Sequence, residues 1–103
     1  METIIRVTTP SIKVTFKIID VSTITKAYLT IDQYSKTIIE KDITQAQKGE
    51  DCLIWTLTQE ETKKIQKNRF LDIQCKYKLQ NGFVGASKMY EVTPYDILKE
   101  DVI

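Results

Sequence analysis

The sequence RFLDIQCKYKLQNGFVGASKMYEV, residues 69–92, decides the fold class of this chain. In its first half, apolar residues alternate with polar ones, and a period of two residues is typical of a β-strand with one buried face. The residues predicted to face the core are Leu71, Ile73, Cys75, Tyr77 and Leu79. We therefore expect a long, half-buried strand that covers one side of a core.

The dipeptide Asn81-Gly82 marks the point where this stretch turns back on itself. Asn-Gly between two alternating runs is the strongest short-range signal for a β-hairpin, because a type I′ turn needs φ > 0 at both central residues. Such a turn would pair Leu79 with Val84 and would direct Val84 and Ala86 towards the core. The stretch is thus predicted to be two antiparallel strands joined by a tight turn.

Strict alternation beyond the turn would also direct Lys88 into the core, whereas Tyr90 and Val92 suit an inward position. A β-bulge inserts one extra residue into a strand and re-aims the side chains that follow it. We expect such a bulge within residues 85–88.

The composition is that of one globular domain. The 103 residues are 42% apolar and include few glycines and prolines, so the chain is not expected to be disordered. No apolar run approaches the ~20 residues of a membrane span, and the N-terminal sequence METIIRV lacks the pattern of a secretory signal. We therefore expect no membrane contact, and a protein kept in a cytoplasm or packed into a particle there.

Other segments show the same strand-like alternation. Segments 3–7, 11–19, 25–33, 37–43 and 52–58 are predicted as strands, and residues 44–51 as an exposed loop. The clear inward faces consist of Ile12, Val14, Phe16 and Ile18, of Ala27, Leu29 and Ile31, and of Leu53, Trp55 and Leu57. Residues 59–68 are mostly polar, and Thr58 and Glu61 have the spacing of a helix capping box. A connecting helix of about two turns is expected to end near Asn68.

Together these elements predict an all-β fold, an immunoglobulin-like β-sandwich of six to seven strands with one short helical crossover. The sandwich would occupy residues 1–94, and residues 95–103 would form a C-terminal tail. An antibody-type domain is not expected, because Cys52, Trp55 and Cys75 lie too close together in the sequence. The two cysteines are predicted to be free thiols, since Cys75 points inward and Cys52 points the other way or lies at a strand edge.

The sequence offers no evident reactive centre. It has no histidine, which excludes Ser-His and Cys-His nucleophilic sites, and two cysteines cannot complete a tetrahedral zinc site. Glu60 and Glu61 are adjacent carboxylates, but neighbours on a helix point about 100° apart and do not converge on one substrate atom. We therefore predict a non-enzymatic protein without a metal or a cofactor.

Basic residues gather in the middle of the chain, where residues 63–88 carry seven of them against a single acidic residue. The outward face of the hairpin should present Lys76 and Lys78, with Phe70 and Phe83 nearby. Basic residues interleaved with aromatic ones on a sheet can bind single-stranded nucleic acid. A net charge of +1 argues against a dedicated nucleic-acid binder, so we expect these four residues to contact a protein or to form a solvated face.

The C-terminal tail is unusually apolar for a free chain end. Its apolar residues are Tyr95, Ile97, Leu98, Val102 and Ile103. Chain ends are usually disordered unless they are tied down. The tail is therefore expected either to pack on its own sandwich or to bind a neighbouring protein, by adding a strand to an edge or by filling a groove.

Three segments carry a resemblance to a known group of proteins. They are Thr8-Thr9-Pro10 before an alternating strand, WTLTQEET at 55–62, and QNGFVGAS at 80–87 with the final strand and a tail ending in Val102-Ile103. They resemble small immunoglobulin-like structural proteins encoded by phages and prophages of Gram-positive bacteria, and are similar to the N-terminal domain of phage baseplate upper proteins. The resemblance implies a virion part in a tail, baseplate, neck or capsid surface, assembled in the host cytoplasm. Its partners would be other virion proteins and copies of itself.

Baseplate upper proteins continue into long fibre-binding regions, whereas this sequence ends at residue 103. The difference favours a small adaptor or capsid decoration protein over a receptor-carrying one. Two alternatives stay open: a carbohydrate- or receptor-binding sandwich, and a phage-encoded inhibitor of a host protein. A sugar site would need clustered aromatic and acidic residues, and Tyr28, Tyr34, Trp55 and Asp32 do not obviously form such a cluster.

Overall fold

The computed structural model describes residues 2–66, 69–87, 90–95 and 102–103, and these are mainly in strands. The strands are β1 (Glu2–Ile5), β2 (Ser11–Thr15), β3 (Ile24–Gln33), β4 (Lys36–Asp42), β5 (Ala46–Lys48), β6 (Cys52–Thr56), β7 (Leu71–Leu79), β8 (Val84–Ala86) and β9 (Tyr90–Tyr95). The other described elements are the helix α1 (Gln59–Lys63) and two 3₁₀ turns, η1 (Val21–Thr23) and η2 (Ile43–Gln45).

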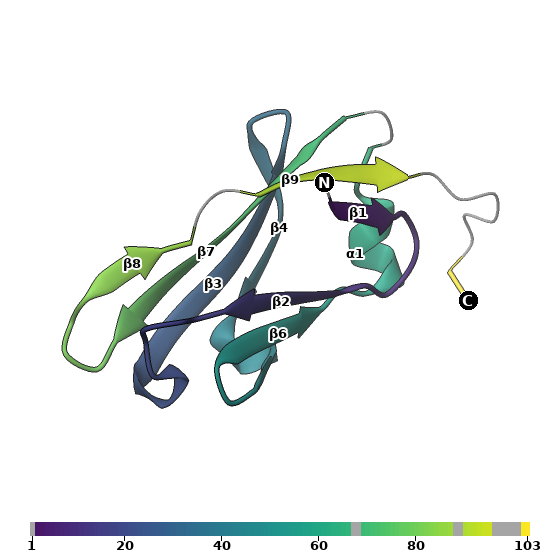
Figure 1. Ribbon diagram of the computed structural model, residues 1–103. Helices are drawn as coiled ribbons and strands as arrows, with labels where there is room; N and C mark the ends of the chain where they lie inside the picture. Colours follow the sequence, from purple (N-terminus) through teal and green to yellow (C-terminus); the bar gives the residue numbers. More distant parts are fainter. Residues whose placement is uncertain (1, 67–68, 88–89, 96–101) are drawn as a thin grey trace.

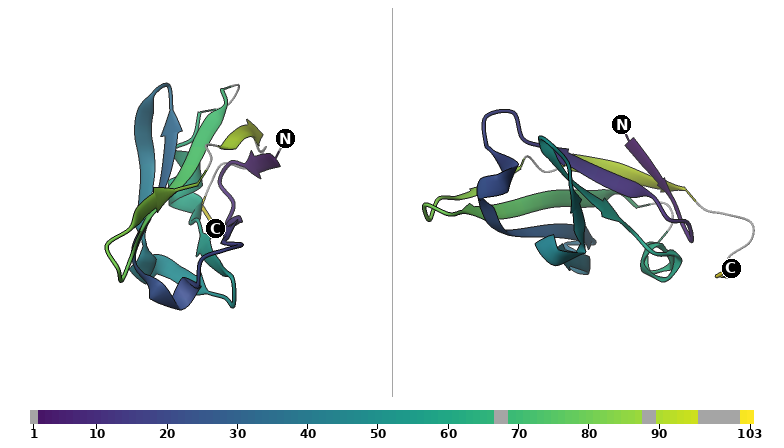
Figure 2. Two further views of the ribbon diagram at one scale, coloured as in Figure 1. Left: turned by 60° about the vertical axis from the view of Figure 1, so that its left-hand side comes forward. Right: turned by 90° about the horizontal axis from the view of Figure 1, so that it is seen from below.

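The strands form two sheets that face each other, so the predicted all-β sandwich is confirmed at this level (Figure 1). The larger sheet has the order β1-β9-β7-β3-β4, with β8 also paired to β7, and the smaller sheet has the order β2-β6-β5. Neighbouring strands run antiparallel, except that β1 runs parallel to β9. Figure 2 shows β2, β6 and α1 on one side of the larger sheet, so the other face of β3 and β7 points outward.

The core lies between the two sheets and is filled by side chains that alternation directs inward. Completely buried residues include Ala27, Leu29, Ile31, Leu53, Trp55, Leu57 and Leu71. Burial of each large apolar side chain stabilises the fold by about 1.5–3 kcal/mol. The predicted inward faces of β3 and β6 are therefore confirmed, and so is that of β7, where Tyr77 and Leu79 are partly buried against the core.

Trp55 joins the two sheets across this core. Its side chain on β6 is completely buried, and its Nε1 donates a hydrogen bond of 2.9 Å to the carbonyl oxygen of Asp42 at the end of β4. A buried indole N–H needs such a partner, because an unsatisfied polar group in a core costs about 1–3 kcal/mol.

Lys41 supplies a second link between layers. It is directed inward from β4, its side chain is only 7% exposed, and its Nζ lies 3.1 Å from the Thr56 carbonyl oxygen and 2.9 Å from Glu61 Oε1. Glu61 also forms the predicted capping box, in which its backbone N–H donates to Thr58 Oγ1 and its carboxylate accepts from Thr58 N–H. Burial alone would raise the pKa of the Glu61 carboxyl, but hydrogen bonds and charge attraction from Lys41 and Thr58 together hold that pKa below its usual value.

The turn between β7 and β8 differs from the predicted type I′ turn. Lys78, and not Leu79, pairs with Val84, which leaves three residues in the loop. Within this loop only Gly82 has a positive φ, of 91°, as in a type I turn followed by a glycine bulge. The pairing is therefore shifted by one residue, and Val84 and Ala86 are exposed on the outward face instead of facing the core.

The pairing of β8 and β9 with β7 changes register by one residue, and the change falls after Ser87, whose N–H still bonds to the Cys75 carbonyl oxygen at 2.8 Å. Lys76 pairs with Ala86, and Ile73 pairs with Tyr90. Over this interval the β8–β9 side has one residue more than the β7 side, as a bulge requires. Lys88 itself lies outside the described residues.

A tight turn with positive φ at both central residues is found in the β3–β4 hairpin, at Tyr34 and Ser35. The Arg69 guanidinium carbon lies 5.1 Å from the centre of the Tyr34 ring. Next to Tyr34, the Gln33 side chain forms two hydrogen bonds of 2.8 Å with the backbone of Gln66. Its Nε2 donates to the Gln66 carbonyl oxygen, and its Oε1 accepts from the Gln66 N–H. These contacts attach the chain that follows α1 to the end of β3.

Three predicted boundaries were wrong. α1 ends at Lys63 instead of near Asn68, because the following chain is held by the end of β3. β2 ends at Thr15, so Ile18 is 98% exposed instead of facing the core. The predicted loop at 44–51 contains η2 and β5, and β5 pairs with β6.

Substitution of Trp55 by Phe should lower the free energy of unfolding by about 2 kcal/mol. The change leaves a cavity and removes the donor to the Asp42 carbonyl. Thermal unfolding followed by circular dichroism should show a melting temperature lower by about 10 °C. Tyr34→Phe, at an exposed aromatic residue, is the matched control and should shift the melting temperature by far less. An equal loss in both variants would contradict the central role of Trp55.

The observed turn geometry predicts that Gly82 is more sensitive to substitution than Asn81. Gly82→Ala forces a side chain into positive φ and should cost about 1–2 kcal/mol of stability. Asn81→Ala removes only an exposed hydrogen bond from the Phe83 N–H and should cost less than about 1 kcal/mol. Urea unfolding of the two variants tests this order, and a larger loss from Asn81→Ala than from Gly82→Ala would contradict this turn geometry.

Candidate interaction surface

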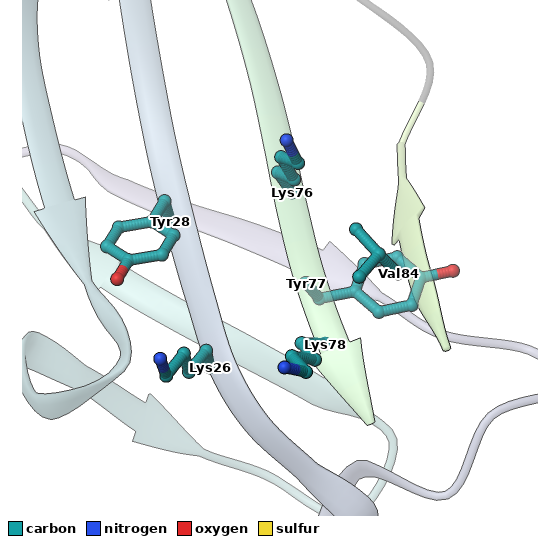
Figure 3. Close-up of a pocket in the computed structure, with 6 residues that line it drawn as sticks. All are labelled: Lys26, Tyr28, Lys76, Tyr77, Lys78 and Val84. Atoms are coloured by element: carbon teal, nitrogen blue, oxygen red, sulfur yellow. The ribbon is translucent and has the colours of Figure 1, made fainter. Parts of the chain in front are cut away.

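A shallow groove on the outward face of the larger sheet is the clearest candidate for a binding surface (Figure 3). It has a volume of about 290 Å³ and is lined by Lys26, Tyr28, Lys76, Tyr77, Lys78 and Val84. Strand pairing brings these residues together, because Lys26 lies opposite Lys78 and Tyr28 lies opposite Lys76. The β8 strand then places Val84 on the other side of Lys78.

The groove combines positive charge with apolar surface. Tyr28 is 40% exposed and Val84 is 51% exposed. Within the described part of the chain, none of the three lysines of the groove forms an ion pair. The groove can therefore offer free ammonium groups and an aromatic ring to acidic and apolar groups of another molecule.

Aromatic rings fix the hairpin tip beside the groove. The Tyr77 ring meets the edge of Phe16 at 5.2 Å between ring centres, and Phe83 packs against its other side at 6.4 Å. Gly85 leaves the space for this arrangement, since a Cβ there would lie 2.5 Å from the Tyr77 hydroxyl oxygen. Phe83 is still 53% exposed, so it extends the apolar surface of the groove at the tip.

The structure divides the predicted partner-binding residues of the hairpin into two places. Lys76, Lys78 and Phe83 lie together at one end of β7. Phe70 is 54% exposed but precedes β7 at its other end, where Lys78 is about 26 Å away at about 3.3 Å per residue. Phe70 therefore cannot belong to the same groove.

The described end of the tail contacts its own chain. The backbone N–H of Ile103 donates to Gln59 Oε1 at 2.9 Å, and its carbonyl oxygen accepts from Gln59 Nε2 at 2.8 Å. The side chains of Val102 and Ile103 are nevertheless exposed, by 42% and 92%. Tyr95 lies at the end of β9, where its backbone pairs with β1.

The other predicted tail contacts, Ile97 and Leu98, lie outside the described residues. The tail is therefore described only at its two ends, and its candidate role in partner binding stays a prediction.

The sequence did not identify four residues of the groove, Lys26, Tyr28, Tyr77 and Val84, and Tyr77 was assigned only to the core. Alternation did place Lys26 and Tyr28 outward, but it cannot show that β3 is the neighbour of β7. Val84 was assigned to the core because the turn was read as one residue shorter than it is. The signal available in the sequence was that two predicted strands, β3 and β7, each carry outward lysines, Lys26 on one and Lys76 and Lys78 on the other.

The two cysteines are free and buried, as predicted for Cys75 and in contrast to the outward or edge position considered for Cys52. Burial raises the pKa of the Cys75 thiol from 9.0 to about 11. A thiol with this pKa is almost entirely protonated at neutral pH, and only the thiolate is a good nucleophile. Cys75 therefore acts as a small apolar core residue.

The described residues contain no group of three or more histidine, cysteine, aspartate or glutamate side chains that could hold a metal ion. No helix in the described ranges is long and apolar enough to cross a membrane. No known protein family, curated protein or solved structure matches the chain.

In the folded chain, Cys75 should react with iodoacetamide at pH 8 at least ~100-fold more slowly than in the urea-unfolded chain. Its raised pKa leaves about one thiolate in a thousand at this pH, and burial blocks access to it. Peptide mass spectrometry reports Cys75 separately from Cys52. Comparable labelling rates in the folded and unfolded chains would show that Cys75 is an accessible, reactive thiol.

Proposed function

We propose that this chain is a non-enzymatic interaction module that acts through protein–protein contacts, and that it is a structural part of a bacteriophage virion. The observation that carries the proposal is the surface at the hairpin end of the larger sheet. There Tyr28, Phe83 and Val84 leave large apolar groups in solvent beside three lysines. Apolar side chains grouped on a rigid surface are typical of protein interaction sites.

The finer architecture that we propose is immunoglobulin-like. Immunoglobulin sandwiches place strands B, E and D in one sheet and C, F and G in the other. In that scheme β2, β6 and β5 take the places of B, E and D, and β3, β7 and β9 take those of C, F and G. The parallel pairing of β1 with the final strand β9 is compatible with a first strand divided between the two sheets.

The virion role rests on the sequence resemblance to small immunoglobulin-like phage proteins, described above. A virion role suits a protein that acts by shape and charge complementarity to its neighbours. An adaptor or capsid decoration protein, assembled with the particle in the host cytoplasm, is the form that we propose. Its partners would be other virion proteins and copies of itself.

Mass spectrometry of particles purified from a host that carries the gene tests this proposal. The chain should be present in stoichiometric amounts, with many copies per particle. Phe83→Asp combined with Val84→Asp should reduce incorporation at least ~tenfold, because a buried interface does not tolerate unpaired charge. Both side chains are about half exposed in the isolated chain, by 53% and 51%, so its melting temperature should fall far less than in Trp55→Phe.

Tyr34→Asp is the matched control, because it adds charge at an exposed aromatic residue at the far end of β3 and Asp tolerates positive φ. This variant should be incorporated normally. A chain that is absent from particles but is recovered with one host protein would be an inhibitor, and the virion role would be wrong. Specific binding to a surface carbohydrate without incorporation would identify a receptor-binding sandwich instead.

A further inference from the structure

The outward face of β3 and β7 is divided into a basic and an acidic end. At the hairpin end, Lys26 lies directly opposite Lys78, with Lys76 on the next outward row. At the other end, Asp32 lies directly opposite Asp72. Every one of these side chains is directed to the face that the smaller sheet does not cover.

This arrangement does not favour the isolated chain. Like charges directly opposite each other on neighbouring strands are destabilising. The two ends are separated by six residues, or about 20 Å, which exceeds the ~8 Å screening length at physiological salt. The acidic end therefore compensates little of the repulsion at the basic end within one molecule.

We propose that this face binds the same face of a second copy of the chain, related by a two-fold axis that crosses the strands. Such an axis reverses the strand direction and places each strand over its own copy. The lysine row of one molecule then lies over the aspartate row of the other. Lys26 faces Asp32 of the second copy, Lys78 faces Asp72 of the second copy, and symmetry repeats both contacts.

The rows between the two ends can fill the centre of this contact. On β3, Tyr28 of each molecule would lie over Thr30 of the second copy. On β7, Gln74 of each molecule would lie over Lys76 of the second copy. Gln74 already donates one amide N–H to the Ser87 carbonyl oxygen at 3.0 Å, and its second N–H and its Oε1 can bond to the second copy. On β4, Asp42 lies opposite Tyr28 and Glu40 lies opposite Thr30, so the axis places Asp42 of one molecule over Glu40 of the other. This like-charge contact at the edge of the face opposes the pairing and keeps the dimer weak.

The size of the face suits a weak, reversible dimer. β3 and β7 are ten and nine residues long, and with seven residues of β4 and three of β8 they make a face on the order of 450 Å². This area is well below the ~800 Å² per partner of a standard stable interface, so the association is expected to be weak. Exposed charge pairs add little affinity each but set orientation and salt dependence.

This dimer names one partner for the proposed assembly function, a second copy of the chain. It rests on the proposed function only as far as that function requires contacts between copies. It is tested on the isolated chain, whereas the virion role is tested on particles. Failure of one is therefore distinguishable from failure of the other.

Sedimentation velocity of the full chain at about 50 mM salt should show a monomer–dimer equilibrium, weakened at least ~tenfold at about 500 mM salt. The double variant Lys26→Glu/Lys78→Glu makes both ends acidic and should weaken the dimer at least ~tenfold. Asp32→Lys/Asp72→Lys makes both ends basic and should have the same effect. An equimolar mixture of the two variants should restore a dimer, because an all-acidic face then meets an all-basic one.

The control is Lys13→Glu/Lys17→Glu, which reverses two lysines away from this face and gives the same net charge as the first variant. It should dimerise like the natural chain, and all variants should keep their melting transitions. A chain that remains monomeric up to about 1 mM, or a dimer that neither reversal weakens, would overturn the proposal. So would an association lost with the lysines but unchanged by Asp32→Lys/Asp72→Lys, which would identify the lysines as a site for a different, anionic partner.

Discussion

Trp55 holds the two sheets in one relative position, and the rest of the structure depends on this contact. Its indole N–H on β6 bonds to the Asp42 carbonyl at the end of β4, where the chain passes from the larger sheet to the smaller one. One residue earlier on β4, Lys41 reaches the Thr56 carbonyl, which belongs to the residue after Trp55. Two consecutive residues of one strand thus bond to two consecutive residues of the facing strand. Apolar packing alone tolerates small sliding of layers, whereas directional bonds in a dry core do not.

A core fixed in this way leaves its interior groups fully occupied. No buried side-chain nitrogen or oxygen among the described residues lacks a hydrogen-bond partner. The buried ammonium of Lys41 is neutralised by Glu61, whose carboxylate at the same time caps α1. Changes that altered either residue would disturb a helix cap and a sheet contact together. Recognition of other molecules is thereby left to the outer faces, where side chains can vary without affecting the packing.

The sequence predicted those parts of the fold that depend on local pattern. Alternation identified the inward faces of β3, β6 and β7, and the Thr58–Glu61 spacing identified the cap of α1. What it could not supply was strand order, because the pairing of β3 with β7 joins residues at least forty positions apart. The groove depends on that pairing, so only two of its three β7 residues, Lys76 and Lys78, were predicted as binding residues from the sequence.

The turn types were the part of the fold that the sequence predicted least well. Asn-Gly has the strongest preference for a type I′ turn, yet the structure uses a three-residue loop there and puts two positive φ values at Tyr34 and Ser35. Local preferences of about 1 kcal/mol were outweighed in both hairpins by contacts of the flanking residues. In the β7–β8 hairpin, the shifted register places Tyr77 opposite Gly85, the residue whose missing side chain leaves room for the Tyr77 ring.

The shifted register also decides the character of the outer face. With the pairing predicted from the sequence, Val84 would be buried and would add nothing to the outer face. With the observed pairing, Val84 lies beside Lys78 and adds apolar surface to a row of charge. Cross-strand repulsion between like charges costs a few tenths of a kcal/mol to about 1 kcal/mol per pair, which is small against a stability of about 5–15 kcal/mol. A sandwich locked by Trp55 and Lys41 can sustain that cost, so the charges of its outer face are free to serve contacts with another molecule instead of the fold.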